Sequence, residues 1–201
     1  MEIVKPCFGK GAGCKISPDC FVDFSQPIIR YMGVNLPHWE QVGKLQYITM
    51  RLADSLPNFK IEELQSRKIQ LQNTDSYVDQ KEYLNEIDRL LAIGKGSCIL
   101  KYDEIQKLIR DALLFYDGVK YDLYEYVIMP NHIHFIILPY TSMKIIMTDF
   151  KRYTTGRIKK ILGTRDNIWQ NDYFDRFVRD DKDYREIAEY IRLNPMGIKK
   201  I

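Results

Sequence analysis

The fold is decided by the stretch YDLYEYVIMPNHIHFIILPY, which spans residues 121–140. It is rich in aromatic and β-branched side chains, which favour extended strands. Met129-Pro130-Asn131 interrupts it. Because proline is confined to the ends, edges and bulges of strands, this interruption predicts a turn or bulge between two strands, or a kink at a sheet edge.

Other elements are predicted on both sides of this stretch from their side-chain periods and breaker residues. A first core strand is expected at 46–52, and an extended aromatic segment at 168–178. Helices are expected over 60–93 (two, with a break near 73–76), 103–116, 143–162 and 183–193, the last ending near Pro195. Strands arranged as hairpins among helices predict an α+β fold with an antiparallel sheet.

Length and composition indicate an ordinary globular protein. The chain has 201 residues, of which 45% are hydrophobic and 28% are charged. We predict one domain over residues 43–201, with a helical insertion at about 60–93, after an irregular extension over residues 1–42. No apolar run approaches the roughly 20 residues of a membrane span, and the start lacks the apolar core of a secretion signal. A cytoplasmic location is therefore expected.

Positive charge is concentrated in one segment, although the net charge is only +3. Seven Lys or Arg residues lie between Lys144 and Arg165, opposed only by Asp149. Such a segment suits a phosphate backbone, although it is equally typical of a solvated helix face.

The four cysteines do not form a recognisable zinc motif. Cys7, Cys14 and Cys20 cluster near the N-terminus, but they lack the paired C-x-x-C spacing of zinc knuckles. Together with Cys98 they are interpreted as reduced structural thiols, with a three-cysteine zinc site as the alternative.

Two of the three histidines lie two residues apart in the predicted strand, at His132 and His134. Side chains at this spacing point to the same face, so both imidazoles can converge on one ion. In the last predicted helix, Tyr190 and Asn194 are four residues apart and share a face. An Asn194 amide oxygen would complete a mixed nitrogen and oxygen set that suits Mn²⁺ or Mg²⁺. Alone, this pair is more often a packed tyrosine and a helix C-cap.

These motifs resemble the REP-associated tyrosine transposases, a branch of the IS200-like, single-tyrosine HUH transposases. The resemblance rests first on Tyr126 to His134 (YVIMPNHIH) and on Tyr190 to Pro195 (YIRLNP). It extends to LPHWE at 36–40, RLADSLP at 51–57 and IWQNDYFDR at 168–176, in the expected order.

The resemblance implies a ferredoxin-like or RRM-like sheet that carries the His-x-His pair. It implies that His132, His134 and Asn194 bind Mg²⁺ or Mn²⁺ and that Tyr190 is the nucleophile. The activity implied is cleavage and rejoining of single-stranded or hairpin DNA, such as a REP element, through a covalent 5′-phosphotyrosine. A homodimer is also expected from the resemblance. No dedicated base for the tyrosine is evident.

DNA contacts are expected from the basic helix and from aromatic residues that could stack on bases. The candidates are Lys151, Arg152, Arg157, Lys159, Lys160, Trp169 and Tyr173, with Phe174 beside them. A core-facing edge strand is the alternative for the aromatic residues. The rival functions are a non-catalytic RRM-like nucleic-acid-binding protein and a phosphodiesterase that uses water, although the latter lacks separated His-x-Thr or His-x-Ser motifs.

Overall fold

A four-stranded antiparallel sheet forms the centre of the protein. The computed structural model describes residues 16–34, 36–71 and 77–194. The strand order is β4-β5-β3-β6, with bounds Tyr121–Ile128, His132–Pro139, Gln46–Arg51 and Phe174–Phe177. The predicted interruption separates β4 from β5, where the Met129 amide donates to the His132 carbonyl at 2.8 Å.

The order of these strands along the chain gives a ferredoxin-like topology. The first strand of the sheet, β3, pairs antiparallel with both β5 and β6, and β4 pairs antiparallel with β5. Helices connect β3 to β4 and β5 to β6. The predicted α+β fold, with helices packed on an antiparallel sheet, is confirmed.

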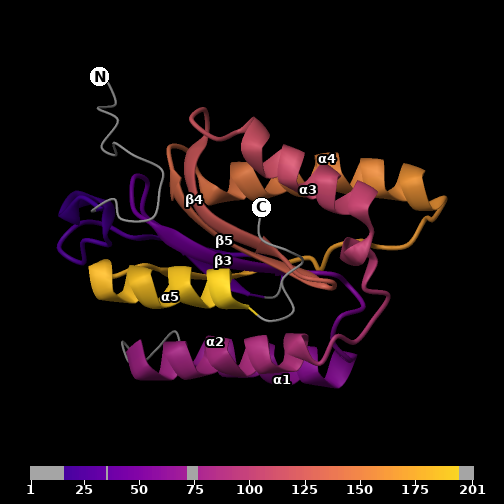
Figure 1. Cartoon of the computed structure of the whole chain (residues 1–201). Coiled ribbons are helices and arrows are strands. Elements are labelled where there is room, and N and C mark those ends of the chain that lie inside the picture. Colours follow the sequence, from indigo (N-terminus) through magenta and orange to yellow (C-terminus); the bar gives the residue numbers. More distant parts are fainter. Residues whose placement is uncertain (1–15, 35, 72–76, 195–201) are drawn as a thin grey trace.

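Helices α3 (Asp103–Phe115) and α4 (Met143–Leu162) cover one face of the sheet (Figure 1). Since side chains alternate along a strand, Ile133 and Phe135 of β5 point into this core. Helix α4 begins and ends as predicted because both ends are capped. The Ser142 side chain accepts from the Lys144 amide at its start, and Gly163 adopts a φ of 64° at its end.

Helices α1 (Asn58–Leu71), α2 (Tyr77–Ala92) and α5 (Asp181–Leu193) cover the opposite face (Figure 1). The predicted helical insertion is therefore a pair of helices, and its break at 73–76 lies outside the described residues. The core on this face includes Ile136 and Leu138 of β5. The side chains of His132 and His134 point to the same face of the sheet as those of Ile136 and Leu138. The histidine pair therefore lies beneath these helices.

The N-terminal segment is more regular than its sequence indicates. Within the predicted irregular extension, β1 (Ile29–Met32) and β2 (Pro37–Glu40) form a two-stranded antiparallel sheet. Four-residue strands are too short to show a hydrophobic period, which explains the difference. The Glu40 carboxylate accepts from the Met143 amide at 2.9 Å, which ties this sheet to the start of α4.

Candidate metal and nucleophile site

The two histidines of β5 form the centre of the site. Their ring centroids are 4.6 Å apart, and the rings are 80° from coplanar. His132 is 1% exposed and His134 is fully buried. Burial lowers the pKa of His132 to about 3 and that of His134 well below its ordinary value. Both imidazoles are therefore neutral near pH 7 and have a ring-nitrogen lone pair to offer.

A neighbouring amide fixes the tautomer of His132. The Asn131 side-chain nitrogen donates to the carbonyls of Leu91 and Lys95 at 3.2 and 3.1 Å, so its oxygen faces His132. That oxygen is 2.7 Å from Nδ1 of His132. Because an amide oxygen only accepts, Nδ1 must carry the proton. The lone pair of His132 is therefore on Nε2, as in many metal-binding histidines.

His134 has one satisfied and one unsatisfied ring nitrogen. Its Nδ1 is 2.8 Å from the Tyr47 hydroxyl and 2.9 Å from the Thr49 hydroxyl. Its Nε2 is buried and has no hydrogen-bond partner among the described residues. A buried polar nitrogen without a partner is costly, which points to a missing ligand.

Tyr190 lies beside this pair in the last turn of α5. Its ring centroid is 5.5 Å from that of His134, and the side chain is 38% exposed. Asp88 and Asn194 both lie close enough to its hydroxyl to influence its pKa. Burial, with the charge of Asp88, raises the pKa of Tyr190 well above 10. The structure thus brings His132, His134, Tyr190 and Asn194 to one place, as the sequence predicted. Their chemical roles stay predictions.

Asp88 of α2 is a member of the site that the sequence interpretation missed. Its Oδ1 is 3.8 Å from Nε2 of His134, and burial raises the pKa of this carboxyl to about 7. A signal was present in the sequence. Asp88 follows Ile87 and precedes Leu91 by three residues, so an acidic residue lies next to the apolar side of an amphipathic helix.

A cleft of about 110 Å³ lies between α2 and α5 at these residues. It is lined by Tyr47, Asn85, Asp88, Arg176, Glu186, Ile187 and Tyr190. Arg176 forms an ion pair with Asp183 at 2.6 Å.

The donor set fits a divalent cation, although the ligands are not yet at coordination distance. Nowhere in the described ranges are three His, Cys, Asp or Glu side chains already arranged as a metal cluster. The fit rests instead on two neutral imidazoles and on the buried, unpartnered Nε2 of His134 and Oδ1 of Asp88. Mixed nitrogen and oxygen ligands suit Mn²⁺ or Mg²⁺.

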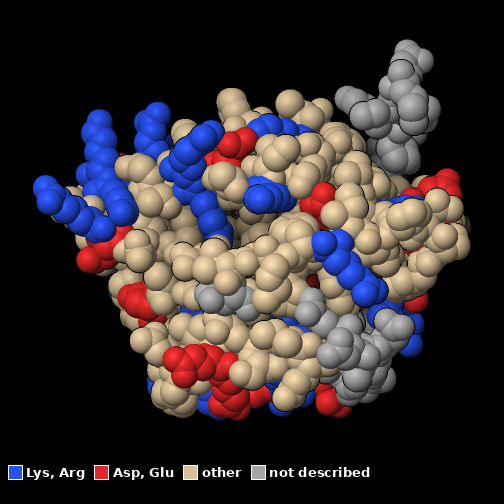
Figure 2. All heavy atoms as spheres, turned by 180° about the vertical axis from the view of Figure 1, so that it is seen from behind, with Lys and Arg blue, Asp and Glu red and all other residues tan. Residues whose placement is uncertain are grey.

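The basic helix lies on the other side of the sheet. The Arg152, Arg157 and Lys160 side chains of α4 are exposed, and Figure 2 shows Lys and Arg side chains projecting from the region where this helix ends. Lys151 is used internally, because its ammonium donates to the Gln170 and Asn171 carbonyls. Lys159 likewise donates to the carbonyl of Arg165 at 3.0 Å.

The aromatic candidates for base stacking are part of the protein core. Trp169 and Tyr173 are each 6% exposed and Phe174 is 4% exposed. The Trp169 indole donates to the Thr154 hydroxyl at 2.9 Å, and Tyr173 stacks on His38 with ring centroids 4.1 Å apart. In this conformation their faces are unavailable to a base, so stacking by these residues is not part of the function proposed below.

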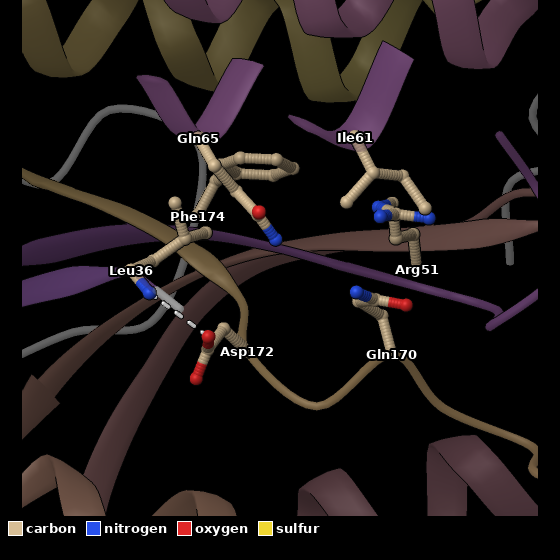
Figure 3. Close-up of a pocket in the computed structure, with 7 residues that line it drawn as sticks. All are labelled: Leu36, Arg51, Ile61, Gln65, Gln170, Asp172 and Phe174. Carbon is tan, nitrogen blue, oxygen red and sulfur yellow. Dashed lines mark hydrogen bonds between the residues drawn. The ribbon is translucent and has the colours of Figure 1, made fainter. Parts of the chain in front are cut away.

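A second, smaller cavity surrounds Arg51, the strand partner of His132 (Figure 3). Gln65 of α1 and Gln170 also line it, and it has room for no more than about one water molecule. Arg51 is 2% exposed, and burial lowers the pKa of its guanidinium to about 10. Its Nη1 donates to the Ser55 hydroxyl at 3.1 Å, so a cation is held beneath α1 on the same face as the histidines.

His38 belongs to a buried ion network and not to the metal site. Its Nδ1 is 2.9 Å from Oδ1 of Asp175, which also accepts from Lys68 at 3.0 Å. Burial alone would raise the pKa of Asp175, but Lys68 and His38 together lower it to about 2. The network joins β2, β6 and α1.

Asp175→Ala is expected to lower the free energy of unfolding by about 3 kcal/mol, because it removes the buried carboxylate that both Lys68 and His38 contact. Urea denaturation measures this. Glu63→Ala, which breaks the exposed Lys60 pair, should cost less than about 1 kcal/mol. The folded-state pKa of Asp175 lies below its unfolded value of 3.8. Its contribution is therefore complete above about pH 4 and is lost as the pH falls toward 2. Equal losses in both variants would contradict this role.

Comparison with known proteins agrees with these motifs. The family model described as "Transposase IS200 like" matches residues 101–194, which include His132, His134, Tyr190 and Asn194. The resemblance to the IS200-like transposases is confirmed. A relative from Haemophilus influenzae, an uncharacterized protein, is 35% identical over 107 residues, a match that covers 41% of this chain and 58% of the relative. The chain thus spans little more than half of that relative.

A solved structure of a REP-associated tyrosine transposase bound to a REP hairpin is also similar. It is 18% identical with a TM-score of 0.43, and the match covers 79% of this chain and 70% of that one. The family model begins at residue 101, so β3 and the α1–α2 pair precede the matched segment.

The remaining sequence predictions fall partly outside the described residues. Cys7 and Cys14 lie there, while Cys20 is buried and Cys98 is half-buried. Within the described residues, no helix is both long and apolar enough to cross a membrane.

Proposed function

We propose that this protein is a metal-dependent, single-tyrosine DNA endonuclease and strand transferase. The observation that carries the proposal is the juxtaposition of Tyr190 with the His132–His134 pair, the rings of Tyr190 and His134 being 5.5 Å apart. A nucleophile next to a cation site is the arrangement that phosphodiester cleavage requires, since the anionic phosphate otherwise repels the attacking oxygen. The motif order favours the REP-associated branch, and a homodimer is proposed on the same resemblance.

His132, His134 and Asn194 are proposed to hold the ion, Mn²⁺ or Mg²⁺. When bound, it neutralises and orients the scissile phosphate. The Tyr190 hydroxyl, which lies near Asp88 and Asn194, attacks the phosphorus in line. The O–P bond to Tyr190 forms as the P–O3′ bond breaks, and the freed 3′ oxygen takes up a proton as the tyrosine loses one. The reverse attack by a 3′-OH rejoins the strand without an external energy source.

Single-stranded or hairpin DNA is the proposed substrate. Tyr190 lines the cleft between α2 and α5 and is partly exposed, so a strand entering this cleft would bring a phosphate to the tyrosine hydroxyl. The paired bases of a hairpin stem would stay outside, toward the surface.

The covalent intermediate provides the decisive test. The protein is incubated with Mn²⁺ and end-labelled hairpins taken from the flanks of its own gene, and the products are separated on denaturing gels. We expect a labelled adduct with the protein that survives denaturation. Specific binding without an adduct would favour a non-catalytic RRM-like nucleic-acid-binding protein. Cleavage without an adduct would favour a phosphodiesterase that uses water.

The exposed basic residues of α4 are expected to contact DNA phosphates. Replacing Arg152, Arg157 and Lys160 by Ala should weaken binding uniformly across DNA sequences. It should also reduce the slope of log affinity against log salt by about 2, since each lost contact to single-stranded DNA contributes about 0.7. Fluorescence anisotropy over a range of salt measures the slope. Replacing the exposed Lys107 of α3 by Ala is the control, and an unchanged slope in the triple variant would place the DNA elsewhere.

A further inference from the structure

We propose that Asp88 of helix α2 is a direct ligand of the divalent cation, together with His132 and His134. This inference rests on the proposed metal site. Oδ1 of Asp88 and Nε2 of His134 face each other at 3.8 Å. Both atoms are buried, and neither has a hydrogen-bond partner in the described part of the chain.

Direct pairing does not explain this geometry. At 3.8 Å the two atoms are too far apart for a hydrogen bond. Two buried polar atoms that face each other without bonding each carry a desolvation cost of about 1–3 kcal/mol. A cation between them would satisfy both, because it accepts the imidazole lone pair and the carboxylate charge at once.

The spacing is close to that of two ligands on one ion. Ligand atoms at about 2.1 Å from an ion and about 90–110° apart are separated by about 3.0–3.4 Å. A small rotation of the Asp88 side chain, which moves its Oδ1 by a few tenths of an ångström, would bring the two atoms to this separation. A carboxylate oxygen is also the ligand type that Mg²⁺ and Mn²⁺ prefer.

Asp88 also connects the ion to the nucleophile. Asp88 and Tyr190 line the same cleft, and the charge of Asp88 raises the pKa of the Tyr190 hydroxyl. With its Oδ1 on the ion, the same side chain would place the cation beside Tyr190. Helix α2 precedes the segment that matches the transposase family model, so the α1–α2 pair would contribute a metal ligand of its own.

Cation binding to the full-length protein without DNA tests this inference. Mn²⁺ is titrated and free Mn²⁺ is followed by electron paramagnetic resonance. Co²⁺ is then added in its place, and the visible spectrum reports the ligand set. Asp88→Asn should weaken Mn²⁺ binding by more than about tenfold, since even removing groups that only support a ligand costs about 10–100-fold. It should also shift the Co²⁺ bands. Glu82→Gln removes an exposed carboxylate from the same helix and should change neither.

Loss of binding in both Asp88→Asn and His134→Ala, with Glu82→Gln unaffected, would support direct ligation. Wild-type affinity and spectrum in Asp88→Asn would overturn it, as would a wild-type protein that binds no Mn²⁺. The failure of the proposed function is distinguishable, because it appears as a missing covalent adduct whatever the result of these titrations.

Discussion

Tyr190→Phe is expected to abolish the covalent protein–DNA adduct and to leave DNA affinity unchanged. Only the hydroxyl is removed, so the ring keeps its position beside His134. Loss of a nucleophile typically lowers turnover by several orders of magnitude, so the adduct should fall below detection, by more than about 1,000-fold. Denaturing gels measure the adduct and fluorescence anisotropy measures the affinity. The folded state should lose only about 1 kcal/mol, the usual worth of a hydrogen bond.

Tyr153→Phe is the matched control. Tyr153 is the rival nucleophile because it lies among basic residues, and its side chain is 45% exposed. It belongs to α4, however, which covers the sheet face opposite the histidines (Figure 1). The Arg157 guanidinium lies 5.4 Å from its ring centroid, and a cation there would repel a metal ion. The adduct should form normally in this variant. An adduct lost only in Tyr153→Phe would reassign the nucleophile and leave the metal site untouched.

The sequence predicted the elements whose signals are local. Helix α4 has a capping serine and a terminal glycine, so its bounds follow from neighbouring residues. The break between β4 and β5 follows from Pro130 in the same way. The convergence of His132 and His134 required only the two-residue period of a strand.

Features that depend on distant contacts were beyond the reach of the sequence. Asp88 precedes His134 by 46 residues, and the two meet only because α2 packs on the sheet beside β5. Its position beside the apolar side of the helix indicates partial burial, but it does not indicate which residue Asp88 contacts. Trp169 and Tyr173 are similar cases, because an aromatic residue in an extended segment has the same local pattern whether it stacks on a base or packs in the core. Which face α4 covers is also a property of the assembled sheet.

His132→Ala and His134→Ala are each expected to abolish adduct formation, with a loss of more than about 100-fold. Each substitution removes one of two imidazole lone pairs, and a cation held by the remaining groups would bind too weakly at ordinary concentrations. Gel assays of the adduct over a range of Mn²⁺ concentrations measure the effect. Circular dichroism and thermal unfolding must accompany them, because His134→Ala also deprives the buried hydroxyls of Tyr47 and Thr49 of their shared partner.

Removing the metal from the wild-type protein should abolish adduct formation as the histidine substitutions do, without disturbing the fold. Excess EDTA should stop adduct formation, and Mn²⁺ or Mg²⁺ added beyond the chelator should restore it. The neutral state of the histidines matters here. Because burial holds the pKa of His132 near 3 and that of His134 well below its usual value, protons do not compete for either nitrogen at neutral pH. The recovery of adduct formation should therefore depend on which ion is added and at what concentration. Protonation of the histidines should not affect it between pH 6 and pH 8. Full activity in excess EDTA would rule out the metal role of both histidines, and Tyr190 would then need another group to offset the phosphate charge.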